Sequence, residues 1–352
     1  MTALTMPARP AGDTGPGAVP WRRMAWVTWR QHRFALAGVA ALLGALTLYV
    51  WISGVKMHHA YAAATACRPL SSPACGNLFV DVNQMNPLLA SGYALLTVPA
   101  LIGMFTGAPV LGRELEAGTF RFAWTQGFGR SRWAVAKLAA LAAVVSAAAG
   151  AISALLSWYY QPYFAARSPV MSFSEIPRLT PGLFPLRGVT FAAWTLAAFA
   201  IGGLAGALIR RVVPAIAATL AACAGLAVVT EIFLRPRYLP PVITSKLNVP
   251  PTAWITSQWL VRNGARSPAH GNQAIRLFQQ LCPSSAAGGP GPAGSVPLSP
   301  VQCFIQHGYT QWTSYQPGSR FWPFQFIEGG WLLALSALLI TVTVWLVRRR
   351  AA

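Results

Sequence analysis

Charged residues are scarce in this chain, and acidic residues are the scarcest. Only 10% of the 352 residues are charged, whereas a typical soluble domain has about 25%. Seven acidic residues stand against 27 lysines and arginines, which gives a formal net charge of +20. The hydrophobic share of 55% excludes an ordinary soluble fold and indicates an integral membrane protein. The basic residues sit beside apolar runs instead of forming one basic face, which argues against nucleic-acid binding.

Lysine occurs only at Lys56, Lys137 and Lys246, and none of them stands in a GxxxxGK[ST] sequence. A P-loop needs that sequence because its lysine must reach the phosphates and its hydroxyl must hold magnesium. GxSxG and HExxH are also absent. The adjacent His58 and His59 project in different directions without a carboxylate or thiol at ligand spacing, so no metal site is predicted. We therefore expect this chain to be neither an ATPase nor another enzyme.

The first residues are predicted to stay outside the membrane core. Residues 1–20 are rich in proline, glycine, alanine and threonine, which predicts a disordered cytoplasmic tail. Residues 21–34 fit an amphipathic helix at headgroup depth, with arginines on one side, one indole ring within that side and another at its edge. The residues singled out there are Trp26, Trp29, Arg30 and Arg33. Two interpretations stay open: a basic anchor for the first span, or an elbow helix that also touches a cytoplasmic partner.

Six apolar runs are long enough to cross a bilayer, and together they predict an all-α transmembrane domain over residues 35–350. They cover residues 34–55, 88–111, 134–159, 189–209, 214–234 and 331–347. Basic residues crowd the short segments on one side, so both termini are expected in the cytoplasm of a cell-membrane protein. Gly202 and Gly206 have GxxxG spacing, which we interpret as packing within the chain and not as a dimer contact.

The loop over residues 112–133, between the second and third runs, mixes acidic and basic residues more densely than any other segment. It cannot stay in hydrocarbon, because each Arg, Lys or Asp at the bilayer centre costs roughly 2.5–3.5 kcal/mol. The sequence of the loop also predicts a short amphipathic helix, whose aromatic residues are not covered by any local core. Such a helix indicates a partner with a groove, although a simple solvated loop remains the alternative.

This loop resembles the first cytoplasmic loop of ABC-2 type transporter permeases. The likeness is carried by an acidic stretch, a Gly-Thr pair, a short helix over residues 120–126 and a basic start to the next span. Its residues are Arg113, Glu114, Glu116, Gly118, Thr119, Phe120, Arg121, Phe122 and Trp124. The sequence WRQHR from Trp29 to Arg33 also looks like actinobacterial members of that family.

The resemblance implies a six-helix exporter of ABC-2 type whose coupling loop contacts an ATPase. Two copies of that cytoplasmic ATPase would bind ATP and magnesium, and a second permease copy would complete the transporter in the lipid bilayer. A central cavity is expected between the second and fifth spans. The expected lining residues are Tyr93, Thr97, Phe105, Thr219, Thr230 and Glu231. A mostly apolar lining with a few hydroxyls suits an amphipathic drug, metabolite or lipid.

Glu231 lies near the outer end of the fifth span, where two roles are open. An ionisable residue inside a membrane segment can touch substrate or carry protons. Alternatively, it is solvated or paired with Arg235 or Arg237. Two other protein classes also stay open: a proton-driven transporter, for which Glu231 is the one intramembrane carboxylate, and a membrane sensor or assembly factor that moves no cargo.

A large extracellular region is predicted over residues 235–328, before the last span. We expect short helices over residues 252–261 and 271–281, with a flexible insert over 283–300. Because an exported loop meets an oxidising environment, Cys67 with Cys75 and Cys282 with Cys303 are predicted disulfides. Cys223, in the fifth span, is left as a buried thiol.

Overall fold

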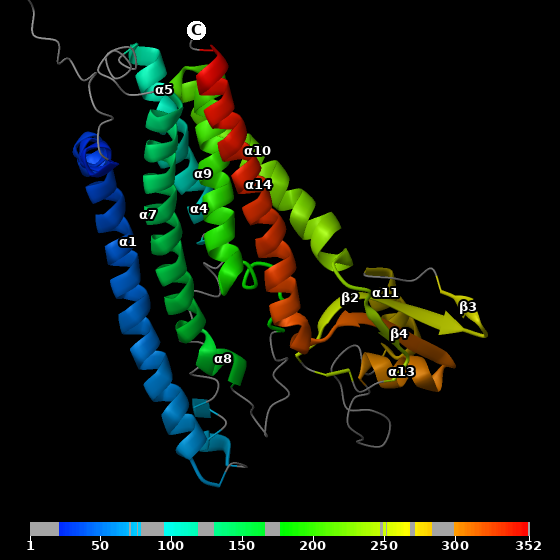
Figure 1. Cartoon of the computed structure of the whole chain (residues 1–352). Helices are drawn as coiled ribbons and strands as arrows, with labels where there is room; N and C mark the ends of the chain where they lie inside the picture. The colour runs from blue at the N-terminus through cyan, green and yellow to red at the C-terminus, as the bar shows by residue number, and fades with distance from the viewer. Residues whose placement is uncertain are drawn as a thin grey trace, which may run out of the picture.

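The computed structural model describes residues 21–69, 72–75, 77–78, 95–118, 130–165, 177–246, 249–250, 252–267, 272–283 and 299–350. Most of these residues are helical, and the helices form an elongated bundle with a small antiparallel sheet beside one end (Figure 1). The predicted tail, residues 1–20, lies outside the described residues. The prediction of a mainly helical protein is therefore confirmed, and the sheet is an addition to it.

Long helices make up the bundle. They are α1 (Trp21–Ala66), α7 (Arg130–Tyr159), α9 (Val189–Ile209), α10 (Val212–Val229) and α14 (Phe321–Arg350), with the short α8 (Gln161–Ala165) after α7. The second predicted span is represented by α4 (Val98–Ile102), the π-helical η1 (Gly103–Gly107) and α5 (Ala108–Ala117). We call the end where Arg210, Arg211, Arg348 and Arg349 lie the arginine end, and the opposite end the sheet end (Figure 1).

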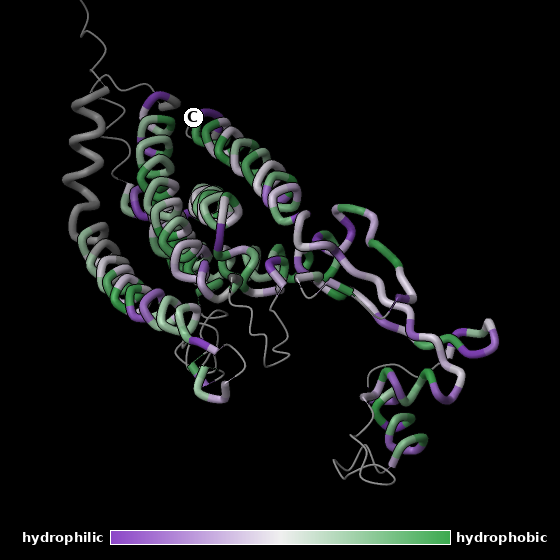
Figure 2. Tube along the Cα trace, turned by 90° about the horizontal axis from the view of Figure 1, so that it is seen from below, coloured by the Kyte–Doolittle hydropathy of each residue, from purple (hydrophilic) through white to green (hydrophobic). Residues whose placement is uncertain are grey.

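Four helices of the described part are long and apolar enough to cross a membrane. They cover Arg132–Tyr159, Val189–Ile209, Val212–Arg237 and Gly318–Arg349. Figure 2 shows that the bundle helices are mostly hydrophobic, whereas hydrophilic residues recur in the sheet region. Large apolar side chains such as Val213, Phe105 and Leu338 are more than half exposed on the bundle surface, as expected where lipid replaces water. The chain is a multi-pass membrane protein.

The residues predicted to form an elbow helix are helical, because α1 begins at Trp21. From there α1 continues without a break to Ala66, through the first predicted span. The second predicted span overlaps residues 79–94, outside the described part of the chain.

Helix α9 lies at the centre of the bundle. In its most apolar stretch 61% of the residues are buried, against 17–28% in the other three candidate spans. Gly202 and Gly206 let the backbone of the second span approach closely: a β-carbon on either would lie less than 3.0 Å from the carbonyl oxygen of Gly103 or Ala108, respectively. The predicted role of the GxxxG spacing in packing within the chain is confirmed.

Two apolar clusters hold α1, α5, α7 and α14 against α9. Toward the sheet end, Val50, Leu156, Tyr159 and Phe191 join α1, α7 and α9. Toward the arginine end, α5, α7, α9 and α14 meet through a second cluster that includes Leu111, Leu138, Phe199 and Val347. The walls of the bundle are thus fixed by side chains from segments far apart in sequence.

The region between η3 (Arg235–Arg237) and α14 contains four strands in the order β1, β4, β2, β3. Their bounds are β1 (Val242–Thr244), β2 (Trp254–Arg262), β3 (Ala265–Arg266) and β4 (Tyr309–Gln316). Strands β2 and β4 are antiparallel, and their register runs from Trp254 opposite Gln316 to Arg262 opposite Tyr309. The all-α prediction is wrong for this region, and so is the predicted helix over residues 252–261. Its β-branched and aromatic residues favour a strand once β4 supplies a partner.

Both predicted disulfides are present. Cys67 pairs with Cys75, and Cys282 pairs with Cys303. The second bridge joins the end of α11 (Asn272–Leu281) to α13 (Pro300–Gln306), so it closes the segment that contains the predicted flexible insert. Helix α11 confirms the predicted helix over residues 271–281, and Cys223 is a buried free thiol as predicted.

Replacing both Cys282 and Cys303 with serine should destabilise the sheet region by about 3 kcal/mol, because the bridge restricts a loop of some twenty residues in the unfolded chain. Hydrogen exchange of the β4 amides would measure this loss of stability. A matched variant in which Cys67 and Cys75 become serine should leave β4 protection unchanged, since that bridge closes a separate loop after α1. Equal exchange in both variants would contradict a stabilising role for the Cys282–Cys303 bridge.

Candidate functional site

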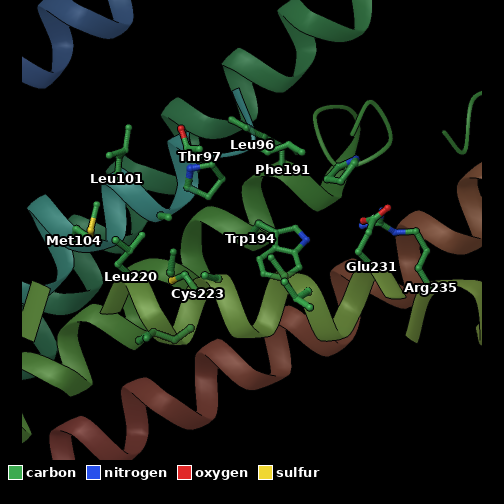
Figure 3. Close-up of a pocket in the computed structure, with 18 residues that line it drawn as sticks. Leu96, Thr97, Leu101, Met104, Phe191, Trp194, Leu220, Cys223, Glu231 and Arg235 are labelled. Atoms are coloured by element: carbon green, nitrogen blue, oxygen red, sulfur yellow. The ribbon is translucent and has the colours of Figure 1, made fainter. Parts of the chain in front are cut away.

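A cavity of about 370 Å³ opens between the second-span segment, α9 and α10. Its volume falls within the range of small-molecule sites, which is roughly 300–1,000 Å³. Figure 3 shows side chains from all three elements converging on it. The lining residues include Leu96, Thr97, Leu101, Met104, Phe191, Trp194, Ile201, Leu220, Cys223, Val228, Glu231 and Arg235. The lining is mostly apolar, and Glu231 and Arg235, the two charged side chains among its described residues, lie together at one end.

Two of the cavity walls contain π-helical turns. One is η1 (Gly103–Gly107) in the second span, and the other is η2 (Thr230–Leu234), which continues α10. A π-helical turn inserts an extra residue into a helix and is frequent at functional sites. Here η2 carries Glu231 at the cavity, while Met104 of η1 lies in the opposite wall.

A buried ion-pair cluster closes the charged end of the cavity. The Arg235 side chain is only 1% exposed, and its Nε and Nη2 donate to the Glu328 carboxylate at 2.9 Å each. Its Nη1 donates to Glu231, one helical turn earlier. Glu328 comes from α14 and is fully buried. Arg235 therefore ties the fifth span to the last helix while it faces the cavity.

Neutral donors complete the shell around Glu328. The Trp194 indole donates to the Glu328 Oε1 at 2.9 Å, and the Tyr238 hydroxyl donates to Oε2 at 3.3 Å. Burial raises the pKa of Tyr238, and the nearby Glu328 carboxylate raises it further. The phenol therefore keeps its proton and remains a donor. The Trp331 indole in turn donates to the Tyr238 oxygen at 3.0 Å.

Glu231 is less completely bonded than Glu328. Its side chain is 33% exposed, and its Oε2 accepts from Arg235. Its Oε1 is buried and has no hydrogen-bond partner among the described residues. Of the roles left open for Glu231, pairing with Arg235 is observed, whereas Arg237 donates to the backbone oxygen of Phe233.

The structure brings only part of the predicted cavity lining together. Thr97 and Glu231 line the cavity, and Tyr93 lies outside the described residues. Phe105 is 59% exposed on the bundle surface. Thr219 and Thr230 are buried, and their hydroxyls donate to the backbone oxygens of Ala215 and Leu226.

Sequence reasoning missed the α9 wall and the role of Glu328. Phe191 and Trp194 line the cavity from α9, between the second and fifth spans. Glu328 was assigned to the end of the predicted extracellular region, but it lies in α14, whose first residue is Phe321. The rarity of acidic residues was the available signal, because a carboxylate so close to an apolar run needs a cationic partner.

A second polar site lies at the arginine end, where α5 leaves the bundle. Glu114 pairs with Lys137 of α7 at 2.5 Å, and Lys137 is only 2% exposed. The Glu116 carboxylate accepts from the backbone nitrogen of Val212, at the start of α10, at 3.0 Å. Gly118 then ends α5 with a φ of +69°, a left-handed conformation that glycine adopts without strain. The two carboxylates thus join α5 to α7 and α10.

Of the remaining predicted contact residues, Arg113 is an exposed residue of α5. Outside the described residues lie Thr119, Phe120, Arg121, Phe122 and Trp124. Trp26, Trp29, Arg30 and Arg33 belong to the helical first turns of α1.

One group among the described residues has three possible metal ligands close together, namely Cys282, Cys303 and His307. Both sulfur atoms are already joined in the disulfide, and the His307 ring contacts the Cys303 backbone oxygen at 3.0 Å. This group therefore has the chemistry of a disulfide with a neighbouring imidazole.

Comparison with known proteins gives one match. The sequence model of the family described as "ABC-2 membrane transporter related" matches residues 40–235. This range contains α5, α9 and most of the cavity lining, and it ends at Arg235. Neither the curated proteins nor the solved structures contain a match to the chain.

Proposed function

The chain belongs to the ABC-2 membrane transporter related family, and from that premise we propose that it is the membrane subunit of an ATP-driven exporter. Two copies of a separate cytoplasmic ATPase would hold ATP and magnesium and would supply the energy. A second copy of this chain would complete the pathway in the cell membrane. The exported cargo would be an amphipathic small molecule: a drug, a metabolite or a lipid.

The proposed topology has six spans and both termini in the cytoplasm. Two further spans, α1 and the segment that ends in α5, would join the four apolar helices of the described part. The arginine end would face the cytoplasm, since arginines and lysines accumulate on that side of membrane proteins. The first turns of α1, with Trp26, Trp29, Arg30 and Arg33, would act as an elbow helix at the headgroups.

The observation that best supports the proposal is the polar contact of α5 with two other spans. Glu114 bonds Lys137 of α7, and Glu116 bonds the first amide of α10. A force applied by an ATPase to the loop after Gly118 would therefore reach the third and fifth spans together. Because α10 forms one wall of the cavity, such a movement would change access to it.

Alanine substitutions in this contact or in the loop should uncouple ATP hydrolysis from cargo. Glu116→Ala removes the acceptor for the Val212 amide, and Trp124→Ala removes a predicted ATPase contact. Each should lower cargo-stimulated ATP hydrolysis in liposomes by about tenfold, the effect of roughly 1.4 kcal/mol. The assay needs the chain co-purified with a cytoplasmic P-loop ATPase that binds it.

A matched variant, Glu116→Gln, retains a carbonyl oxygen that can accept from Val212 and should keep most of the stimulation. Unchanged coupling in both alanine variants would refute the coupling role of residues 112–133. If the ATPase binds but no cargo stimulates hydrolysis, the result would favour a membrane sensor over an exporter.

A further inference from the structure

We propose that the cavity between the second-span segment, α9 and α10 binds a lipophilic cation, whose charge lies against Glu231. This inference rests on the proposed function only in treating the cavity as a cargo site. It adds a chemical class to the cargo, because it requires one positive charge on an otherwise apolar body.

The first argument is the charge of the cluster at the cavity end. Arg235 supplies one positive charge, and Glu231 and Glu328 supply two negative charges when ionised. Arg235 directs two of its nitrogens to Glu328, which also accepts bonds from Trp194 and Tyr238. Glu328 is therefore neutralised and fully bonded. The excess negative charge belongs to Glu231.

The second argument is the position of the Glu231 carboxylate. Glu231 lines the cavity, and its Oε1 is buried without a hydrogen-bond partner among the described residues. A buried carboxylate oxygen with no donor is unfavourable, so a cation at this place would remove a cost that already exists. Figure 3 shows Glu231 and Arg235 side by side, with the Trp194 indole between them and the apolar lining.

The third argument is the composition of the walls. Phe191 and Trp194 are aromatic, and Met104 carries a polarisable sulfur. The faces of aromatic rings attract cations, more strongly where water is excluded. The same walls offer an anion no free charge, because three nitrogens of Arg235 are already bonded to carboxylates. The cavity therefore selects a ligand by the sign of its charge as well as by its hydrophobicity.

Binding of a matched pair of ions to the purified full chain in detergent, without ATPase, tests the proposal. Tetraphenylphosphonium and tetraphenylborate have nearly the same size and shape but opposite charge, so each is measured against its own background in protein-free detergent and only saturable binding is compared. We expect saturable binding of radiolabelled tetraphenylphosphonium, at least about tenfold tighter than that of tetraphenylborate, as for one modest charge interaction. Glu231→Gln should remove most of this preference, whereas Glu231→Asp should keep it.

The two variants also separate binding from folding. Glu231 is partly exposed, and Arg235 keeps its Glu328 partner in both, so both variants should elute and melt like the parent chain. Equal affinity for the two ions, tighter binding of tetraphenylborate, or an unchanged preference in Glu231→Gln would each overturn the proposal. None of these results depends on ATP, so loss of the cation site would leave the exporter proposal standing, and failed ATPase coupling would leave the cation site standing.

Discussion

Arg235→Met should destabilise the protein by about 3–5 kcal/mol, the range measured when one partner of a buried ion pair is removed. Methionine fills much of the space of the arginine side chain. It leaves the fully buried Glu328 without the two hydrogen bonds that Arg235 donates to it at 2.9 Å each. Trp194 and Tyr238 can still donate to Glu328, but neither carries a positive charge. The midpoint of thermal unfolding of the purified chain in detergent measures the loss.

The double variant Arg235→Met, Glu328→Gln is the control for this prediction. The glutamine removes the fully buried charge, and its carbonyl oxygen can still accept from the Trp194 indole. The Glu231 charge that remains lies on a side chain that is 33% exposed. Most of the lost stability should therefore return. If the double variant were as unstable as Arg235→Met alone, the cost would come from lost packing and not from the buried charge.

The ion-pair cluster also shows what a sequence can predict about this site. Glu231 and Arg235 are one helical turn apart, a spacing that lets side chains pair, and this pair was one of the alternatives left open by the sequence. Glu328 is 93 residues from Arg235, across the whole sheet region, and no local pattern connects the two. The sequence could therefore name the Glu231–Arg235 pair as an alternative, but the contact with Glu328 required the fold.

The helices, too, were predictable from local sequence signals, whereas the sheet depends on contacts between distant segments. The bounds of α9, Val189–Ile209, were predicted without error, because an apolar run between a glycine and two arginines is a local signal. The sequence predicts a helix in place of strand β2, because the partner strand β4 begins only at Tyr309 and follows an insert of unrelated composition. The tryptophans of β2, Trp254 and Trp259, lie opposite Gln316 and Trp312 of β4.

The cavity was only half predicted, for a related reason. The second and fifth spans do line it, but Thr219 and Thr230 use their hydroxyls on their own helices, as threonines in apolar helices commonly do. The third wall, α9, had been assigned only a packing role through Gly202 and Gly206. Helix α9 performs both roles, since it packs closely on the second span and presents Phe191 and Trp194 to the cavity.

Replacing both Gly202 and Gly206 with alanine should destabilise the bundle by roughly 1–3 kcal/mol at each position, the usual cost of overpacking. Each added methyl group would lie less than 3.0 Å from a carbonyl oxygen of the second span, and backbone cannot rotate away as a side chain can. The second-span segment would have to move off α9, so the unfolding midpoint in detergent should fall sharply.

Gly150→Ala combined with Gly225→Ala is the matched control, because a β-carbon at either position meets no atom of the described chain within 4 Å. Alanine favours a helix over glycine by about 0.5–1 kcal/mol, so this control should be as stable as the parent or slightly more stable. If the GxxxG pair joined two copies of the chain instead, the Gly202 and Gly206 variant would melt normally and change only its oligomeric state. A lowered midpoint at constant oligomeric state is therefore the result that assigns these glycines to the wall of the cavity.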